Sequence, residues 1–268
     1  MGELIFIGLG LADEFDISLR GFEIIREADF VFAEFYTSLM PGFSLDNFKK
    51  ITRKEIKIVN RKNLEEEKGE TILKKAKDSS VAFLVPGDPL IATTHIDLRI
   101  RAEEQGINTR IVHGASIISA VVGLSGLQNY RFGKSVTIPF PEGDFISETP
   151  SRVIAENKAR DLHTLCFLDI RVEENKFMTI KEALESLLII NRRKKQHIVT
   201  LKSLAVSVAR AGVRDVVVRA DYVKNLMNYD FGAPPHTLIF PANKLHFIEA
   251  EALINLAYAP EQIREMVK

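Results

Sequence analysis

The chain contains 268 residues and carries 36 Lys and Arg residues against 36 Asp and Glu residues, so its formal net charge is zero. This balance excludes a broadly basic protein that coats nucleic acid or an anionic membrane. Hydrophobic residues make up 46% of the chain and charged residues 27%, proportions that are typical of a globular protein and exclude global disorder. The length predicts one large domain or two of modest size.

Cys166 is the only cysteine, which excludes an intramolecular disulfide and a cysteine-based zinc site. The six histidines do not follow HExxH or a comparable ligand spacing, so we expect no metal site. The apolar run at residues 4–12 is too short to span a membrane, follows no basic segment and ends in acidic residues rather than at a cleavage site. We therefore expect a soluble, cytoplasmic protein without a targeting segment.

The first half of the chain alternates short apolar runs with helix-compatible segments. A continuous apolar run is typical of a strand that is buried on both faces of a parallel sheet. In chain order, the predicted elements are strands at 4–7, 30–33, 54–59, 81–85 and 109–112, and helices at 18–28, 64–77 and 97–105. Five strands that alternate with helices predict a doubly wound, mostly parallel α/β domain.

The second half predicts another α/β domain with a different sheet. Its predicted elements are helices at 116–127, 153–160 and 179–190, and strands at 135–138, 164–169, 204–210, 216–219 and 237–240. The strands at 216–219 and 237–240 have short connections, which favours some antiparallel pairing and hence a mixed sheet. We place the boundary near His113, with an N-terminal domain at 1–112 and a C-terminal domain at 113–268.

A glycine pair, Gly8 and Gly10, directly follows the first predicted strand. Two glycines allow a tight turn and let a ligand approach the backbone without obstruction by a Cβ atom. A dinucleotide fingerprint needs a third glycine where this chain has Asp13, and that carboxylate would lie where a pyrophosphate binds. Glu34, after the second predicted strand, could bind a ribose, so an NAD-dependent oxidoreductase is an alternative, as is a purely structural turn.

A second loop, at residues 86–89 (Pro-Gly-Asp-Pro), follows the strongest predicted strand. Its two prolines make the loop stiff and hold the Asp88 carboxylate in place. Ligands of open α/β sheets bind beyond the carboxyl ends of the strands, and a carboxylate there suits an ammonium, a sulfonium or ribose hydroxyls. The alternative is a structural turn, the commoner role of such a string. Ser116, which opens a predicted helix, is either an N-cap or a ligand contact.

Two motifs of the second half bring small or restrained residues to strand ends. Residues 209–212 (Ala-Arg-Ala-Gly) end one predicted strand, where small side chains permit the close approach of a flat ring. His236 opens another strand after two prolines that restrain it, although a lone histidine is more often a hydrogen-bonded core or surface residue. The chain contains no Gly-x-Ser-x-Gly elbow, no Walker A motif and no nucleic-acid-binding signature.

Together and in this order, the motifs resemble the tetrapyrrole methylase superfamily of S-adenosylmethionine-dependent methyltransferases, and within it the diphthine synthases. The specific strings are Phe-Ala-Glu-Phe-Tyr-Thr-Ser at 32–38, and Gly-Asp-Pro-Leu followed by Ala-Thr-Thr-His at 87–95. The resemblance extends from the first predicted strand to about Ala259. Many superfamily members have Gly-x-Gly-Pro-Gly-Asp in the first loop, whereas residues 8–13 are Gly-Leu-Gly-Leu-Ala-Asp. This difference favours the diphthine synthases over the porphyrinoid (precorrin-type) methyltransferases, which are the alternative.

The resemblance implies two α/β domains with S-adenosylmethionine bound in the cleft between them, and a homodimer. It implies methylation of the amino group of a 3-amino-3-carboxypropyl chain on one histidine of translation elongation factor 2. Three methylations would give diphthine in diphthamide biosynthesis, with S-adenosylhomocysteine as co-product, and neither nucleic acid nor membrane is implied as a partner. By the family pattern, the residues that contact the cofactor are Leu11, Asp88, Ile91, Ser116, Ile117, Leu168, Ala211 and His236.

Methyl transfer to a neutral amine moves charge from sulfur to nitrogen with little net change, so neither a metal nor an oxyanion hole is needed. The enzyme's main task is to align the nitrogen, carbon and sulfur atoms. An aliphatic amine is mostly protonated near pH 7, so a carboxylate, a histidine or water must accept its proton before attack. His95 and Asp169 are candidates for this base, although His95 could instead be a histidine that is hydrogen-bonded at a helix start. A non-catalytic binding module is the alternative of another class.

Overall fold

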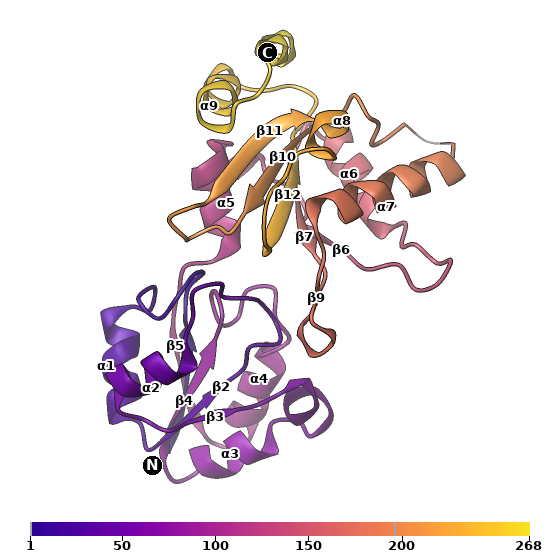
Figure 1. Ribbon diagram of the computed structural model, residues 1–268. Coiled ribbons are helices and arrows are strands. Elements are labelled where there is room, and N and C mark those ends of the chain that lie inside the picture. Colours follow the sequence, from indigo (N-terminus) through magenta and orange to yellow (C-terminus); the bar gives the residue numbers. More distant parts are fainter. Residues whose placement is uncertain (1, 196) are drawn as a thin grey trace. The chain divides into compact units, whose positions relative to one another are not determined.

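The computed structural model describes residues 2–195 and 197–268 (Figure 1). The chain forms two compact units, one of Met1–Ile117 with Val172–Asn175 and the other of Ile118–Arg171 with Lys176–Lys268. Each unit has its own sheet and its own helices, so the predicted α/β class is confirmed. The predicted domain boundary between residues 112 and 113 stays a prediction.

The first unit is built on a five-stranded sheet with the order β3-β2-β4-β1-β5, in which neighbouring strands are parallel. The strands are β1 (Glu3–Gly8), β2 (Phe30–Ala33), β3 (Ile56–Ile58), β4 (Ser80–Val85) and β5 (Asn108–Val112). All five lie where the sequence predicts strands. β1 and β4 are buried along almost their whole length, which explains why both are continuous apolar runs.

Helices cover both faces of this sheet (Figure 1). They are α1 (Leu19–Glu27), α2 (Leu45–Thr52), α3 (Glu70–Ala76) and α4 (Ile96–Glu104). Ile5 and Ile7 of β1 belong to the apolar cluster that α1 and α2 complete. Leu4 and Phe6 of the same strand belong to the cluster of α3 and α4. Alternate side chains of one strand thus enter two separate cores, as a doubly wound sheet requires.

The helix predicted at 64–77 is divided in the structure, and the prediction of one continuous helix is wrong. A short π-helix, η1 (Lys62–Glu66), is followed by a turn in which Lys68 has φ 56° and Gly69 has φ 67°. Gly69 then serves as the N-cap of α3. Two successive residues in the left-handed region cannot continue a right-handed helix. The helical spacing of apolar residues at 64–77 therefore extends over two elements, η1 and α3.

The second unit contains a mixed sheet with the order β11-β10-β12-β7-β6. The strands are β6 (Val136–Ile138), β7 (Thr164–Leu168), β10 (Leu204–Ala209), β11 (Val217–Tyr222) and β12 (His236–Phe240). β10 pairs antiparallel with both β11 and β12, β12 pairs antiparallel with β7, and β6 runs parallel to β7. The mixed sheet that the short connections predict is therefore confirmed. A small hairpin of β8 (Ile170–Arg171) and β9 (Lys176–Phe177) was not predicted.

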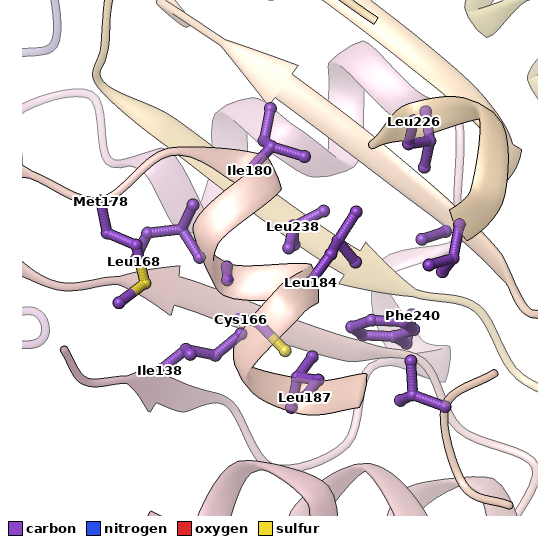
Figure 2. Close-up of a cluster of buried hydrophobic side chains, with 14 of the residues drawn as sticks. Ile138, Cys166, Leu168, Met178, Ile180, Leu184, Leu187, Leu226, Leu238 and Phe240 are labelled. Atoms are coloured by element: carbon purple, nitrogen blue, oxygen red, sulfur yellow. The ribbon is translucent and has the colours of Figure 1, made fainter. Parts of the chain in front are cut away.

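The helices of this unit pack an apolar core onto the sheet. They are α5 (Ile117–Ser125), which starts at the last residue of the first unit, α6 (Thr149–Ala159), α7 (Ile180–Arg193), α8 (Val223–Leu226) and α9 (Phe247–Ala257). α7 begins at the predicted capping box of Thr179 and Glu182. Figure 2 shows Leu184 and Leu187 of α7 in one cluster with Cys166 of the sheet. Burial raises the pKa of the Cys166 thiol, so the single cysteine is a core residue.

A buried polar network ties α9 to distant parts of the second unit. The Glu249 carboxylate is fully buried and accepts a charged hydrogen bond from Arg131. It also accepts hydrogen bonds of 2.9 Å from His163 Nε2 and from the backbone N–H groups of Gln128 and His246. Burial alone would raise the pKa of Glu249, but the hydrogen bonds from His163 and the two amides outweigh it and lower the pKa to about 2.

Candidate active site

The connections that leave β1 and β4 run in opposite directions across the first sheet. β1 leads through α1 to β2 on one side, whereas β4 leads through α4 to β5 on the other side of β1. β1 and β4 are themselves neighbours, so the sheet has its topological switch point at their carboxyl ends. Ligands of open α/β sheets bind at such a point, which makes the loops after β1 and β4 the candidate site of this unit.

Three glycines bring the ends of β1, β4 and β5 into backbone contact. A Cβ atom on Gly8 would lie 2.5 Å from the carbonyl oxygen of Gly87 and 2.6 Å from the nitrogen of Gly114. A Cβ atom on Gly114 would lie 2.4 Å from the same Gly87 oxygen. Gly10 and Gly87 also exchange two backbone hydrogen bonds, of 3.3 and 2.7 Å. The three loops therefore form one closely packed backbone surface that excludes side chains at these positions.

The first loop is shaped by Asp16, a residue that the sequence analysis did not single out. Its Oδ2 atom accepts hydrogen bonds from the backbone N–H groups of Leu11, at 2.9 Å, and Ala12, at 2.7 Å. Glycine is required beside it because Gly10 has φ 83° and a Cβ atom there would lie 2.3 Å from the Asp16 Cβ. Leu11, a predicted cofactor contact, is thus held in place by a carboxylate five residues away.

The second loop carries Asp88, which is 6% exposed and whose carboxylate contacts two neighbours. Its Oδ2 atom lies 2.7 Å from His113 Nδ1, and its Oδ1 atom accepts a hydrogen bond of 3.4 Å from the backbone N–H of Leu90. Its carbonyl oxygen accepts from the backbone N–H of Ile91 at 3.3 Å. His113, which directly follows β5, entered the sequence analysis only as a boundary marker, because nothing in the sequence pairs residues that are 25 positions apart.

Five predicted cofactor residues lie at this edge of the first sheet. Leu11 follows β1, Asp88 and Ile91 follow β4, and Ser116 and Ile117 follow β5. Because the three strands are neighbours and parallel, their carboxyl ends bring these residues to one edge. These contacts were predicted from the resemblance to the family pattern, and their role as a binding site stays a prediction.

The charge of these loops restricts the ligands that they fit. Residues 9–18 and 86–95 contain four carboxylates and neither a lysine nor an arginine. The carboxylates belong to Asp13, Glu14, Asp16 and Asp88. A cationic ligand such as a sulfonium or an ammonium compound suits this set, whereas a pyrophosphate would be repelled.

His95, one of the two predicted base candidates, lies in a buried pair with Glu34. His95 Nε2 is 3.1 Å from Glu34 Oε1, and the exposed fractions of the two residues are 2% and 0%. Glu34 Oε2 accepts the backbone N–H groups of Tyr36 and Thr37. The specific string at 32–38 is therefore explained by a polar core around Glu34, which leaves that carboxylate no access to the ribose of a dinucleotide.

Asp169, the other candidate base, follows β7 in the second unit. Its Oδ2 atom accepts a hydrogen bond of 2.9 Å from the backbone N–H of Phe140 and lies 3.5 Å from Arg171 Nε. These partners fix the loop after β6 to the end of β7. Both predicted base roles, for His95 and for Asp169, stay predictions.

Leu168, Ala211 and His236 come together at one end of the second sheet. Leu168 ends β7, Ala211 follows β10, and His236 opens β12, which lies between those two strands. His236 is paired with Ala209 across the sheet, its Nε2 atom donates to the carbonyl oxygen of Ala233 at 3.2 Å, and it is 7% exposed. Burial lowers the pKa of His236, so its imidazole is neutral at physiological pH.

Arg210 holds the loop around Ala211 and was missed as a site-forming residue. It has φ 53°, and its Nη1 atom donates hydrogen bonds of 2.7 Å to the carbonyl oxygens of Phe231 and Ala233. The loops after β10 and before β12 are thereby joined. The five predicted contacts of the first unit and the three of the second thus form one group in each unit, and a common cleft for both groups stays a prediction.

Comparison with known proteins identifies the family. A model of the Tetrapyrrole (Corrin/Porphyrin) Methylases matches residues 3–221. The diphthine synthase of Methanosarcina acetivorans is 50% identical over 267 residues, which is 98% of each chain. The chain belongs to the diphthine synthase family. The diphthine synthase of Methanocella arvoryzae is 51% identical over 254 residues, 95% of this chain and 98% of its own. A crystal structure of diphthine synthase matches with a TM-score of 0.90 at 42% identity, covering 98% of this chain and 99% of its own.

The matches to diphthine synthases confirm the predicted enzyme class, an S-adenosylmethionine-dependent methyltransferase of the tetrapyrrole methylase fold. They cover both units, so all loops described above lie within the shared region. Among residues 2–195 and 197–268, no group of three or more His, Cys, Asp or Glu side chains could hold a metal ion. In that same part of the chain, no helix has the length and apolar character that crossing a membrane needs.

Proposed function

We propose that this chain transfers methyl groups from S-adenosylmethionine to the amino group of the 3-amino-3-carboxypropyl chain on one histidine of translation elongation factor 2. Three transfers would give diphthine, a step of diphthamide biosynthesis, and each would release S-adenosylhomocysteine. The observation that carries the proposal is the similarity to a diphthine synthase at 50% identity over 98% of both chains. A similarity of this extent includes every loop of the candidate site.

The cofactor contacts that we assign come from both units. They are Leu11, Asp88, Ile91, Ser116, Ile117, Leu168, Ala211 and His236. The acidic loops of the first unit support a cationic cofactor, because Asp88 and its neighbouring carboxylates would attract a sulfonium. The neutral His236 of the second unit would not repel it.

When bound, S-adenosylmethionine supplies a methyl group that its sulfonium makes electrophilic. The residues of the chain would orient the reactants, because most of the rate gain in such a transfer comes from holding nitrogen, carbon and sulfur in line. The rigid backbone contacts among Gly8, Gly87 and Gly114 support this task, since they fix three site loops relative to one another. The remaining task is to accept the proton of the amine before each attack.

The two enzyme alternatives have less support. An NAD-dependent oxidoreductase would use Glu34 for a ribose, but Glu34 is fully buried and its oxygens already accept hydrogen bonds from protein donors. Asp13 and Asp88 would also repel a pyrophosphate. A porphyrinoid methyltransferase would share the cofactor, but the first loop lacks the Pro-Gly of that pattern, and the relatives described above are diphthine synthases.

The proposal includes a homodimer in the cytoplasm, with elongation factor 2 as the protein substrate. Size-exclusion chromatography with light scattering measures the oligomeric state directly. A mass of one chain across the micromolar concentration range would contradict the dimer without affecting the proposed reaction.

The experiment has two stages that separate cofactor from substrate. Calorimetry first measures S-adenosylmethionine binding to the purified chain, with NADH titration as the control ligand. The chain is then incubated with elongation factor 2 purified from cells that lack the methylation step, and mass spectrometry of the modified peptide counts the added methyl groups. We expect three methyl groups on the modified histidine and none on factor that lacks the 3-amino-3-carboxypropyl chain. Cofactor binding without methyl transfer would contradict the proposed substrate, and binding of NADH alone would contradict the methyltransferase.

A further inference from the structure

The proposed reaction needs a proton acceptor, and both predicted candidates are already engaged by other groups of the chain. His95 is 2% exposed and its Nε2 atom faces Glu34. The Asp169 carboxylate is already engaged by the Phe140 amide and by Arg171. Carboxylates in general are also weaker bases than imidazole, since free Asp titrates at about 4 and free His at about 6.5.

His113 has the exposure and the partner that such a base needs. Its side chain is 76% exposed, whereas that of its partner Asp88 is 6% exposed. The two are joined by the hydrogen bond of 2.7 Å between His113 Nδ1 and Asp88 Oδ2. Because Gly87 and Gly114, the next residues to each, belong to the close backbone contact of the site loops, the pair is held at the switch-point edge of the first sheet.

The hydrogen bond to Asp88 determines which nitrogen of His113 can act. An ionised carboxylate only accepts hydrogen bonds, so the proton lies on Nδ1 and the lone pair lies on Nε2. A carboxylate in this position orients a histidine and stabilises the imidazolium that forms when Nε2 takes up a proton. Histidine is also the side chain that most often serves as a general base in enzymes.

We propose that His113 is the general base of the methyl transfer, with Asp88 as the residue that positions it. This inference rests on the proposed function and adds a residue role to it. Asp88 then has two tasks. One is its predicted contact with the cofactor, and the other is to orient His113 through Oδ2, the carboxylate oxygen that faces this histidine.

The proton and electron balance of each round is complete. The substrate ammonium gives one proton to His113 Nε2, and the freed nitrogen lone pair forms the bond to the methyl carbon. The bond between that carbon and sulfur breaks, and its electron pair stays on sulfur as the thioether of S-adenosylhomocysteine. His113 then releases its proton to solvent, which its exposure permits. Over three rounds the ammonium loses three protons, and the trimethylammonium product has none left to lose.

Among the described residues, Asp88 is the charged group that is hydrogen-bonded to the His113 side chain. Arg110, which lies on β5 three residues before His113, is ion-paired at 3.5 Å to Glu3 of β1. In the neighbouring loop after β1, the Asp13 and Asp16 carboxylates accept hydrogen bonds from amides of their own loop.

The test uses His113→Asn in the full-length chain. The asparagine amide can donate to Asp88 from the position of Nδ1, but it cannot accept a proton at neutral pH. Three quantities are measured for wild type and variant: the dissociation constant of S-adenosylmethionine, the free energy of unfolding in urea, and the single-turnover rate of methyl transfer to elongation factor 2 from pH 6 to pH 9.5. His197→Asn, an exposed histidine of the second unit, is the matched control.

We expect His113→Asn to bind S-adenosylmethionine within about twofold of wild type and to transfer methyl groups roughly 10²- to 10⁴-fold more slowly at pH 7. The defect should shrink as the pH rises, because the amine then loses its proton without a base. Wild type should instead rise through the titration range of histidine and level off, and His197→Asn should follow wild type.

Two results would overturn the inference while leaving the proposed function intact. One is a variant with the wild-type rate and pH profile. The other is a rate loss of equal size at every pH together with weakened cofactor binding, which would assign His113 to cofactor binding alone. Failure of the wild-type chain to methylate elongation factor 2 is a different outcome, since it contradicts the proposed function and removes the inference with it.

Discussion

Glu34 and His95 face each other at 3.1 Å inside the first unit, where neither is more than 2% exposed. Glu34 also accepts the backbone N–H groups of Tyr36 and Thr37. Glu34→Ala would leave two amides and an imidazole buried without a partner. We expect the free energy of unfolding, measured in urea at pH 7, to fall by about 3–5 kcal/mol.

Glu55→Ala is the control for this prediction. Glu55 also makes an ion pair, with Lys49 at 2.9 Å, but its side chain is 93% exposed. Its removal should change the free energy of unfolding by less than about 1 kcal/mol. An equally small effect of Glu34→Ala would show that the buried pair is not a structural element of the specific string at 32–38.

The glycine contact among the site loops predicts a strong effect of one methyl group. Gly114→Ala would place a Cβ atom 2.4 Å from the Gly87 carbonyl oxygen, which is backbone and cannot rotate away. We expect a loss of stability of about 3 kcal/mol or more, or a shift of the loops that weakens S-adenosylmethionine binding at least tenfold. Gly123→Ala in α5 is the control, since a Cβ atom there meets nothing within 4 Å. It should be neutral or stabilise by up to about 1 kcal/mol. Equal behaviour of the two variants would contradict the close contact.

The lowered pKa of Glu249 predicts how stability depends on pH. The ordinary value is 4.5 and the value in the folded chain is about 2, so the unfolded chain binds a proton first as the pH falls. The stability that Glu249 contributes is therefore fully present above pH 4.5 and is lost as the pH falls toward 2. In urea unfolding, the difference between wild type and Glu249→Gln should shrink over that range. A constant difference from pH 6 to pH 3 would contradict the prediction, and Glu261→Gln, at an exposed ion pair, should show little difference throughout.

The role of Asp16 predicts a variant that weakens binding more than folding. Asp16→Ala removes the acceptor for the Leu11 and Ala12 amides, so the first loop loses its fixed shape. We expect the dissociation constant of S-adenosylmethionine, measured by calorimetry, to rise about tenfold, with a loss of about 1–3 kcal/mol in unfolding free energy. Glu23→Ala on the exposed face of α1 should leave both quantities near wild type. Unchanged binding by Asp16→Ala would remove Leu11 from the proposed contacts.

The sequence predicted strands well where burial leaves a strong pattern. β1, β2 and β4 are continuous apolar runs because helices cover both faces of their sheet, and their bounds differ from the predicted ones by at most one residue. α2, α8 and α9 were not predicted at all. α9 carries large apolar residues on exposed as well as buried positions, such as Phe247 at 57% exposure and Leu253 at 0%, so no single apolar face marks it as a helix.

The sequence predicted the loops that form the candidate site, but it did not predict which residues pair within them. Strand ends and glycines pointed to the correct loops, since those signals are local. The pairs that organise the loops are not local: Asp88 meets His113 across 25 positions, and Glu34 meets His95 across 61. Such contacts follow from the strand order of the sheet, which apolar periodicity does not contain.

The network around Glu249 has a consequence for the order in which the chain is made. All five strands of the first sheet precede residue 113. By contrast, Arg131 and His163 gain their shared carboxylate only when Glu249 is synthesised, 118 residues after Arg131 and 86 residues after His163. At a synthesis rate of about 5–20 residues per second, Glu249 is added to the chain roughly 6 to 24 s after Arg131. The first sheet can thus form while the second unit is still incomplete, and α9 completes the buried polar network of the second unit.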